Sequence, residues 1–430
     1  MSDSSNDGFL PRWRLKTAGV IAPDERLPWG QTIIVGIQHV VAMFGSTALA
    51  PIIMGFDPNV SILFSGIGTL IFFLMVGGRV PSYLGSSFAF IAVVMAVTGY
   101  TGSGPNPNIG LALGGIVAAG VVYALIGLIV SVAGYAWVEK VMPPVVTGAV
   151  VAAIGLNLAP LAVKSVSGSG FATVIGLSTV VAVGGFAVYA PGMARRLPIL
   201  LGGLFAYFLY LIAANGMGLG KPIDFSGVAN ANWIGMPNFA TPVFSGSAMG
   251  LIAPIAIILV AENLGHIKAI GAMTDRNLDP YLGRAFLGDA VATIISALGG
   301  GTGVTTYAEN MGVMAATKIF STLAFVVAGL FAILLGFSPK FGMLILTIPA
   351  PVIGGLELVI FGLISATAGR IWVENKVDFS SPRNLITTAV TLTAGAGDLV
   401  INLGSFTLGG IGTATFGAII LYQLLREKAE

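Results

Sequence analysis

The chain contains no cysteine, only two histidines and few charged side chains. Of its 430 residues 9% are charged, whereas about 25% are charged in a typical soluble domain. Without cysteine there are no disulfides and no thiolate zinc sites, and two histidines make metal chemistry a poor explanation. The sequence also lacks a Walker motif and a nucleophile elbow. We therefore expect no cofactor, no metal, no nucleic-acid partner and no enzymatic activity.

Long apolar runs fill most of the chain instead. Hydrophobic residues make up 56% of it and 60 residues are glycine, which suits close packing between helices and helices that are broken inside a bilayer. The sustained alternation of a β-barrel is missing. We expect an all-α polytopic membrane protein with fourteen spanning segments. These lie near residues 30–54, 58–77, 83–99, 108–133, 142–163, 171–191, 197–215, 245–272, 283–300, 304–318, 319–337, 341–364, 382–397 and 408–425.

Positive residues are distributed unevenly over the loops between these segments. Of the 20 lysines and arginines, only Lys164, Lys221 and Lys340 fall on the side opposite the N-terminus. The remaining 17 fall on the N-terminal side, and such an excess marks the cytoplasmic side of a membrane protein. We therefore expect both termini to be cytoplasmic. Residues 1–29 are polar, and we expect them to form a cytoplasmic segment without a cleavable signal peptide.

Two of the fourteen segments are too polar or too rich in glycine to be whole helices. Residues 81–90 open the third segment, and residues 299–309 open the tenth. Because these positions are seven segments apart, they suggest two repeats of seven segments with inverted orientation, and interrupted segments in such repeats point to a transport site. Each would contain an extended stretch followed by a half-helix whose N–H groups face the membrane midplane. The alternative is that the glycines only allow tight packing.

Two acidic residues fall inside apolar segments, and each is followed by asparagine. Glu262 precedes Asn263, and Glu309 precedes Asn310. A carboxylate within a membrane is costly and by default marks a pathway or a binding site. His266 follows Glu262 by four residues and shares its helix face, so the two could hold and pass a proton. The alternative is a structural pair that bridges helices.

Glu309 falls at the start of the second half-helix. The helix dipole favours a negative charge there, so this carboxylate could accept hydrogen bonds from a ligand. The alternative is a plain helix cap. Asn310 could brace the adjacent loop.

Three further polar residues fall within spans. We expect His39 and Asp289 to support the structure rather than to bind a ligand. Glu357 lies well inside its span, where it either lines a water-filled route or ends near an interface.

Several motifs of the chain resemble those of a known family. Glu309-Asn310-x-Gly312, with Thr317-Lys318 after it, Gln38-His39 in the first segment and residues 83–90 in the third segment are similar to motifs of the nucleobase–ascorbate transporter family. The resemblance extends from about residue 11 to residue 425. Within the family the chain most resembles the bacterial uracil:proton symporters, which are proteins of the cytoplasmic membrane.

The resemblance implies a fold and a domain organisation. It implies fourteen spans in a seven-plus-seven inverted repeat, with short antiparallel strands in segments 3 and 10, and a homodimer. Two domains are expected, each formed from two parts of the chain. The core domain would contain residues 30–140 and 241–338, and the gate domain would contain residues 141–240 and 339–430.

The resemblance also implies roles for particular residues. Glu262 and Glu309 would bind the nucleobase, and His266 would act with Glu262 in proton coupling. Phe88 would pack against the ring, and the backbone near Tyr307 and Ala308 would contact its carbonyl groups. The residues expected to support this site are His39, Ser87, Asp289 and Asn310.

Three residues depart from the pattern of the family's uracil carriers. These carriers have glycine where this chain has Ala308, tyrosine where it has Phe361, and a small polar residue near Glu357. The resemblance therefore leaves open which bases the protein transports. It also leaves open which contacts Glu357 and Phe361 make in the gate domain.

Together these patterns predict a secondary-active importer of uracil that is driven by protons. Uracil is flat and neutral, and its two N–H donors and two carbonyls suit carboxylates, half-helix N–H groups and an aromatic wall. One alternative is the same kind of carrier for xanthine or another oxopurine. Another is an anion carrier or channel-like protein of the same fold, although two acids in the site argue against an anion.

Overall fold

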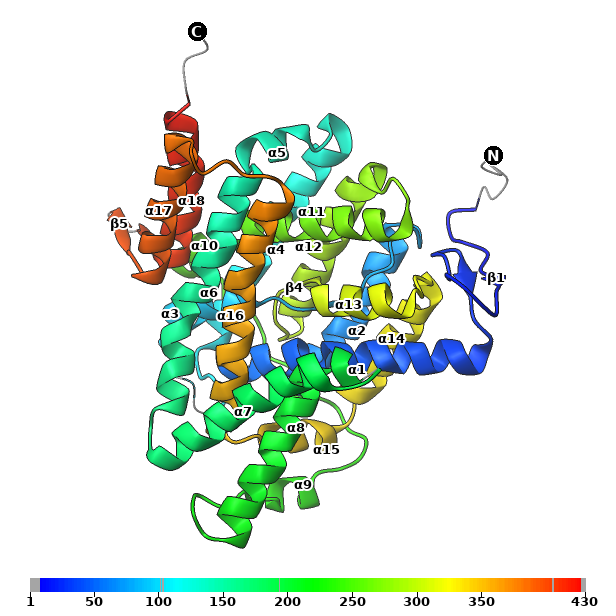
Figure 1. The fold of residues 1–430 in the computed structure, drawn as a ribbon, viewed down its shortest axis with the longest axis vertical. Coiled ribbons are helices and arrows are strands. Elements are labelled where there is room, and N and C mark those ends of the chain that lie inside the picture. The colour runs from blue at the N-terminus through cyan, green and yellow to red at the C-terminus, as the bar shows by residue number, and fades with distance from the viewer. Residues whose placement is uncertain (1–7, 101, 103, 193, 404–405, 427–430) are drawn as a thin grey trace. The chain divides into compact units, whose positions relative to one another are not determined.

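The computed structural model describes residues 8–426 apart from 101, 103, 193 and 404–405, and it is almost entirely helical (Figure 1). Among these residues nine helices are long and apolar enough to cross a membrane, and one bent pair of helices raises the number to ten. Two shorter apolar helices lie at Phe88–Thr98 and Gly410–Leu424. The expectation of a helical polytopic membrane protein is confirmed. The total of fourteen spans and the inverted repeat stay predictions.

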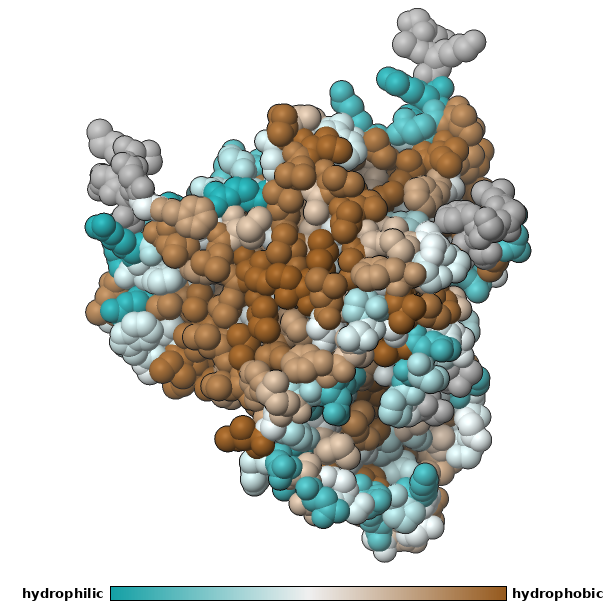
Figure 2. All heavy atoms as spheres, turned by 180° about the vertical axis from the view of Figure 1, so that it is seen from behind, coloured by the Kyte–Doolittle hydropathy of each residue, from teal (hydrophilic) through white to brown (hydrophobic). Residues whose placement is uncertain are grey.

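Apolar side chains cover much of the face that Figure 2 shows, and hydrophilic side chains gather there in separate patches. Leu125, Val181 and Leu334 are each more than half exposed. A soluble protein seldom exposes a large apolar patch, whereas lipid accommodates such side chains.

The chain divides into two compact units. The first contains the residues up to Phe88 together with Thr98–Gly134 and Ser226–Leu346. Within it α4 packs against α12, and α2 packs against α12 and α14. Its elements are β1 (Arg14–Leu15), β2 (Glu25–Arg26), α1 (Trp29–Met54), α2 (Pro58–Met75), β3 (Leu84–Ser86), α4 (Ile109–Ala133), α9 (Ser226–Asn230), α10 (Gly246–Ile252), α11 (Ile255–Thr274), η4 (Asp279–Tyr281), α12 (Leu282–Leu298), β4 (Val304–Thr306), α13 (Ala308–Thr317), α14 (Thr322–Gly336) and α15 (Pro339–Leu346).

The second unit contains Ala89–Val97, Tyr135–Phe225 and the residues from Thr347 onward. Within it α16 packs against α6 and α7, and α17 packs against α6 and α18. Its elements are α5 (Ala136–Val141), α6 (Pro144–Val166), α7 (Gly170–Tyr189), η2 (Ala194–Arg196), α8 (Pro198–Leu211), η3 (Ile212–Gly216), α16 (Ala350–Glu374), α17 (Pro382–Ala396), β5 (Ile401–Leu403), β6 (Phe406–Leu408) and α18 (Gly410–Leu424). One boundary between the units, between residues 88 and 89, falls within the short helix η1 (Phe88–Phe90). Another, between residues 97 and 98, falls within α3 (Ile91–Thr98).

The predicted span at residues 341–364 is wrong at its start. Residues 341–346 belong to α15, which follows α14 at a bend of 83°. A new helix, α16, starts at Ala350, with Pro349 at its N-cap. Proline has no N–H to donate and is favoured where a helix begins, so Pro349 and Pro351 separate the two helices.

Glycine allows α2 and α14 to approach closely. A Cβ atom on Gly66 would lie only 2.4 Å from the carbonyl oxygen of Gly329. The expectation that glycine serves close helix packing is confirmed at this contact.

The two broken segments pair with each other as strands. β3 and β4 are antiparallel, with Leu84 opposite Thr306 and Ser86 opposite Val304. All six strand residues are buried. Beyond the strands, the Ser87 N–H donates to the Gly303 carbonyl at 2.9 Å. The prediction of short antiparallel strands in these two segments is confirmed.

Hydroxyl groups from neighbouring helices extend this pairing. The Leu84 N–H donates to Thr69 Oγ1 of α2 at 2.9 Å, and the hydroxyl of Thr293 in α12 donates to the Val304 carbonyl at 3.0 Å. Irregular backbone at membrane depth requires such partners. The strands are thereby fixed to α2 and α12.

Gly85, in the centre of β3, leaves no room for a side chain. A Cβ atom there would lie 2.4 Å from Thr47 Oγ1 and 2.6 Å from the Tyr307 ring. We predict that Gly85→Ala lowers the free energy of unfolding by about 1–3 kcal/mol through overpacking. Thermal unfolding of the purified protein measures this loss. In the control variant Gly184→Ala, where nothing lies within 4 Å of the added atom, stability should not fall. Equal stabilities of the two variants would contradict the packing described here.

Residues 8–28 of the N-terminal segment are structured rather than a plain polar tail, while residues 1–7 lie outside the described residues. The segment's strands β1 and β2 are parallel, and Ile21 forms a bridge with Ile319. Ile21 and Leu27 are buried in a cluster that also contains Ala324. Because Ile319 follows α13 and Ala324 lies in α14, this cluster attaches the segment to the junction between those two helices.

Asp24 connects the same segment to the end of α11. Its carboxylate accepts a hydrogen bond from Arg276 and forms an ion pair with it. Partial burial alone would raise the pKa of the Asp24 carboxyl, but the hydrogen bond and charge of Arg276, aided by Arg14, lower this pKa below its usual value.

We predict that Asp24→Asn destabilises the protein at neutral pH by about 1 kcal/mol, since the pair is partly exposed. A carboxyl group whose pKa is lower in the folded state stabilises the protein above its unfolded pKa, and this contribution is lost as the pH falls through the folded pKa. The difference between the melting temperatures of wild type and variant should therefore vanish in strong acid. Glu374→Gln, which removes an exposed acid, serves as control. A difference that persists unchanged at low pH would exclude this ion pair as its cause.

Candidate functional site

The two acids predicted to form the site lie close enough for their charges to interact. Glu262 is in α11, and Glu309 is in the first turn of α13. Both are half-buried, so both remain accessible. The structure therefore brings together two residues that are 47 positions apart in the sequence.

The end of β3 and the middle of β4 face Glu262. The side chains of Ser87 and Thr305 lie beside its carboxyl group. The Thr305 hydroxyl is buried and lies within hydrogen-bonding reach of this carboxyl group. The strand β4 thus contributes to the polar surroundings of Glu262.

His266 lies one turn after Glu262 on α11, and β4 fixes its ring. Its Nδ1 atom is 2.8 Å from the hydroxyl of Thr306, the strand residue opposite Leu84. This contact orients the imidazole, and which ring nitrogen carries the proton depends on whether Thr306 donates or accepts.

Each acid is followed by an asparagine that is completely buried and braces another helix. Asn263 donates to Asp289 Oδ2 of α12 at 2.7 Å and to the Tyr123 hydroxyl of α4 at 2.9 Å. Asn263 and Asp289 are 0% exposed, so they cannot meet solvent. Asp289 therefore lies where a supporting residue is expected.

The second asparagine repeats this arrangement. Asn310 Nδ2 donates to the His39 carbonyl and lies 3.0 Å from His39 Nδ1. The His39 ring packs against Phe325, with 4.3 Å between ring centroids. Asn310 and His39 are 0% exposed, which places both behind the accessible acid Glu309.

Tyr307, Ala308 and Phe88 differ in what they offer to a ligand. The Tyr307 side chain is used internally, since its hydroxyl donates to the Ser86 carbonyl at 2.8 Å and accepts from Thr47 at 3.0 Å. Ala308, the first residue of α13, is exposed, and Phe88 is half-buried. Tyr307 makes no side-chain cap for this helix, and the first N–H groups of a helix have no partner within it. A ligand could thus meet the start of α13 and the Phe88 ring.

Glu357 and Phe361 belong to α16 in the second unit. They are 2% and 1% exposed. Both side chains are buried, and the two positions that the sequence allows for Glu357, along a water-filled route or near an interface, stay predictions.

Several residues that hold the site together carry no distinctive signal in the sequence. Thr47, Tyr123 and Thr306 do not stand out, because threonine and tyrosine are common in apolar helices and strands. Asn263 does stand out in the sequence, since it repeats the acid–asparagine order of Glu309 and Asn310, but the sequence analysis gives it no role of its own.

Within the described ranges, no three His, Asp or Glu side chains gather where they could hold a metal ion. The carboxyl groups of Glu262 and Glu309 can accept hydrogen bonds from a ligand and can carry protons.

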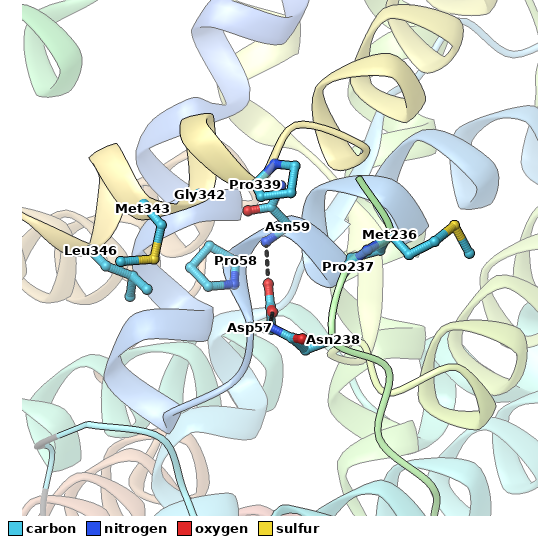
Figure 3. Close-up of a pocket in the computed structure, with 10 residues that line it drawn as sticks. All are labelled: Asp57, Pro58, Asn59, Met236, Pro237, Asn238, Pro339, Gly342, Met343 and Leu346. Atoms are coloured by element: carbon cyan, nitrogen blue, oxygen red, sulfur yellow. Dashed lines mark hydrogen bonds between the residues drawn. The ribbon is translucent and has the colours of Figure 1, made fainter. Parts of the chain in front are cut away.

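A small pocket lies away from these residues, between the start of α2, residues 236–238 and α15 (Figure 3). Its volume of about 90 Å³ is well below the roughly 300–1,000 Å³ of typical small-molecule sites. The Asp57 carboxylate at its edge accepts from the Asn59 N–H at 2.7 Å and from Asn238 at 3.1 Å. Asp57 thus acts as the helix cap of α2.

Comparisons with known proteins identify the family. The family model Xan_ur_permease, described as "Permease family", matches residues 30–404. A protein of Escherichia coli strain K12 named as a candidate pyrimidine permease, RutG, is 62% identical over 425 residues, which cover 98% of this chain and 96% of the relative. A uracil permease of Paenibacillus larvae is 40% identical, covering 94% and 96%. A uracil permease of E. coli K12 is 36% identical, covering 95% of each.

Solved structures show the same fold at low sequence identity. The transmembrane domain of a cyanobacterial bicarbonate transporter, BicA, has a TM-score of 0.62 at 15% identity, covering 91% of this chain and 97% of that one. The murine anion transporter Slc26a9 has a TM-score of 0.65 at 12% identity, covering 92% and 68%. Relatives named as permeases match this chain over nearly its whole length and theirs. The chain therefore belongs to this permease family and is a multi-pass membrane transporter rather than an enzyme.

Proposed function

We propose that this protein imports uracil across the bacterial cytoplasmic membrane together with protons, by alternating access and with both termini in the cytoplasm. The observation that carries the proposal is the meeting of two half-buried acids, Glu262 and Glu309, beside paired strands within apolar helices. Relatives named uracil permease at 36–40% identity support the choice of uracil.

The chemistry of the site matches that of the base. Uracil presents two ring N–H donors, which the carboxylates of Glu262 and Glu309 can accept, and two carbonyl oxygens. The N–H groups at the start of α13, near Ala308, can donate to a carbonyl. Phe88 supplies a flat apolar surface for the ring. Each polar edge of the base thus has a counterpart.

The two like charges of the site support the proposed proton coupling. Two carboxylates that interact in a site of low dielectric repel each other, so the binding of one proton removes this repulsion. Uracil itself is neutral, and the proton that accompanies it makes transport electrogenic. His266 lies one turn from Glu262 and is a suitable exchange group.

The first alternative substrate is xanthine or another oxopurine. It offers similar N–H and carbonyl groups on a larger ring. This chain has Ala308 where the family's uracil carriers have glycine. Because position 308 is exposed, its side chain affects how large a base the site can hold.

An anion is a weaker candidate, although solved anion transporters share the fold. The likeness to them shows the fold alone. Glu262 and Glu309 would repel an anion at the proposed site.

We further propose that the first compact unit corresponds to the core domain and the second to the gate domain, as the family resemblance implies. The carrier would form a homodimer, and its two seven-span repeats would be inverted.

Uptake into cells that lack their own nucleobase carriers tests the function. Cells that produce this protein should accumulate labelled uracil, and a protonophore should abolish the accumulation. Uptake of labelled xanthine, measured in the same cells, tests the alternative substrate. Accumulation above equilibrium after the gradient has collapsed would mean that another ion drives transport.

We predict that Glu309→Gln weakens uracil binding while membrane insertion stays intact. The loss of a charge-assisted hydrogen bond costs about 1.5–3 kcal/mol, or roughly 10–100-fold in affinity. Calorimetry on the purified protein measures this. Glu139→Gln, which changes an exposed acid in α5, should bind like wild type. An unchanged affinity in Glu309→Gln would remove Glu309 from the binding site.

We predict that Glu262→Ala abolishes both binding and coupled transport, whereas His266→Ala keeps part of the binding and loses coupling. Alanine at 262 cannot accept the ring N–H, while the loss of the imidazole changes how readily Glu262 exchanges its proton. Equilibrium binding and proteoliposome counterflow separate the two effects. Wild-type binding in Glu262→Ala, together with no binding in His266→Ala, would reverse the roles.

A further inference from the structure

A third acid lies within a membrane helix, and the proposed binding of uracil does not use it. Glu357 is in α16 of the second unit and is 2% exposed. Its Oε2 atom has no hydrogen-bond partner in the described part of the chain. An ionised carboxylate in such a place has a large desolvation cost without compensation.

Close helix packing surrounds the turn that precedes Glu357. A Cβ atom on Gly355 would lie 2.5 Å from the carbonyl oxygen of Gly176 in α7, and one on Gly354 would lie 2.5 Å from Ser165 Cβ in α6. The backbones of α16, α6 and α7 are thus in direct contact on both sides of the turn that precedes Glu357. A water molecule that could solvate a charge has no room at these contacts.

Ser165 of α6 is the side-chain hydrogen-bonding neighbour of Glu357. Its hydroxyl also lies 3.1 Å from the Leu161 carbonyl, to which it can donate. Ser165 is itself neutral, so it places no charge beside the Glu357 carboxyl group that would offset the cost of ionisation.

No cation compensates Glu357 from the described helices packed against α16. The titratable residues on α6, α7 and α8 are Lys164, Tyr189, Tyr207 and Tyr210. Lys164 and Tyr189 are exposed. The hydroxyl of Tyr207 pairs with Thr347, and that of Tyr210 donates to the Lys221 carbonyl. On α16 itself, Arg370 pairs with Glu374.

We propose that Glu357 is a second proton-binding site, neutral in this conformation, which exchanges its proton with water when α16 changes its packing during transport. The carboxyl O–H bond then breaks, the proton passes to water, and the carboxylate later takes a proton back from water. This proposal rests on the proposed proton-coupled function. It adds a proton carrier in the second unit that is separate from Glu262 and His266.

Infrared spectroscopy of the purified protein tests the neutral state without any transport. The carbonyl stretch of a protonated carboxylic acid should be present at neutral pH in wild type, and Glu357→Gln should remove one component of it. Ser165→Ala should shift this component to higher frequency, because the carboxyl group loses its side-chain hydrogen-bonding partner. Glu374→Gln, an exposed acid on the same helix, should leave it unchanged. A spectrum that Glu357→Gln does not change would overturn the proposal.

Proteoliposomes test the exchange of the proton. Glutamine has the shape of a neutral glutamic acid but cannot release a proton. Glu357→Gln should therefore keep uracil binding and counterflow and should lose proton-driven uptake. Proton-driven uptake equal to wild type would overturn the exchange role. If wild type takes up no uracil at all, the proposed function and the exchange role fail together, whereas the infrared result still decides whether Glu357 is neutral.

Discussion

The pairing of β3 with β4 is the constraint on which the candidate site depends. Extended backbone cannot remain unpaired at membrane depth, and these two strands satisfy each other over three residue pairs. The ends of the strands also determine where the accessible residues begin: Phe88 follows β3 after a single residue, and Ala308 and Glu309 follow β4 after a single residue. A shift in the register would move Thr305 and Thr306 away from Glu262 and His266, because side chains alternate along a strand.

Buried amides divide the site into an accessible layer and a supporting layer. Glu262 and Glu309 are half-buried, while the asparagine after each is 0% exposed and bonded to another helix. Consecutive residues on a helix point about 100° apart, so one can face a ligand while the next faces the core. This arrangement holds the acids on rigid elements, which favours precise recognition of a small ring.

The sequence was sufficient to predict the broken segments, their extended stretches and the two acids, because polar residues within apolar runs are rare enough to stand out. The antiparallel pairing of the two strands was expected from the family resemblance. His39, Asp289 and Asn310 were expected to support the site, but Thr47 and Tyr123 were not. Thr47 and Tyr123 lie far from their partners in the chain, and only the fold brings them to Tyr307 and Asn263. The break at Pro349 was missed because apolar residues continue on both sides of it. The neutral surroundings of Glu357 likewise depend on α6 and α7, which no local pattern connects to α16.

The central claim is that carboxylates of this site accept the ring N–H groups of the base. Calorimetric binding of uracil, 1-methyluracil and 3-methyluracil to the purified protein tests it most directly, because each methyl group removes one donor. The account predicts that at least one methylated base binds roughly 10–100-fold more weakly than uracil, the loss expected for a charge-assisted hydrogen bond. Equal affinities for all three bases would contradict the account, since the carboxylates would then recognise no N–H group of the ring.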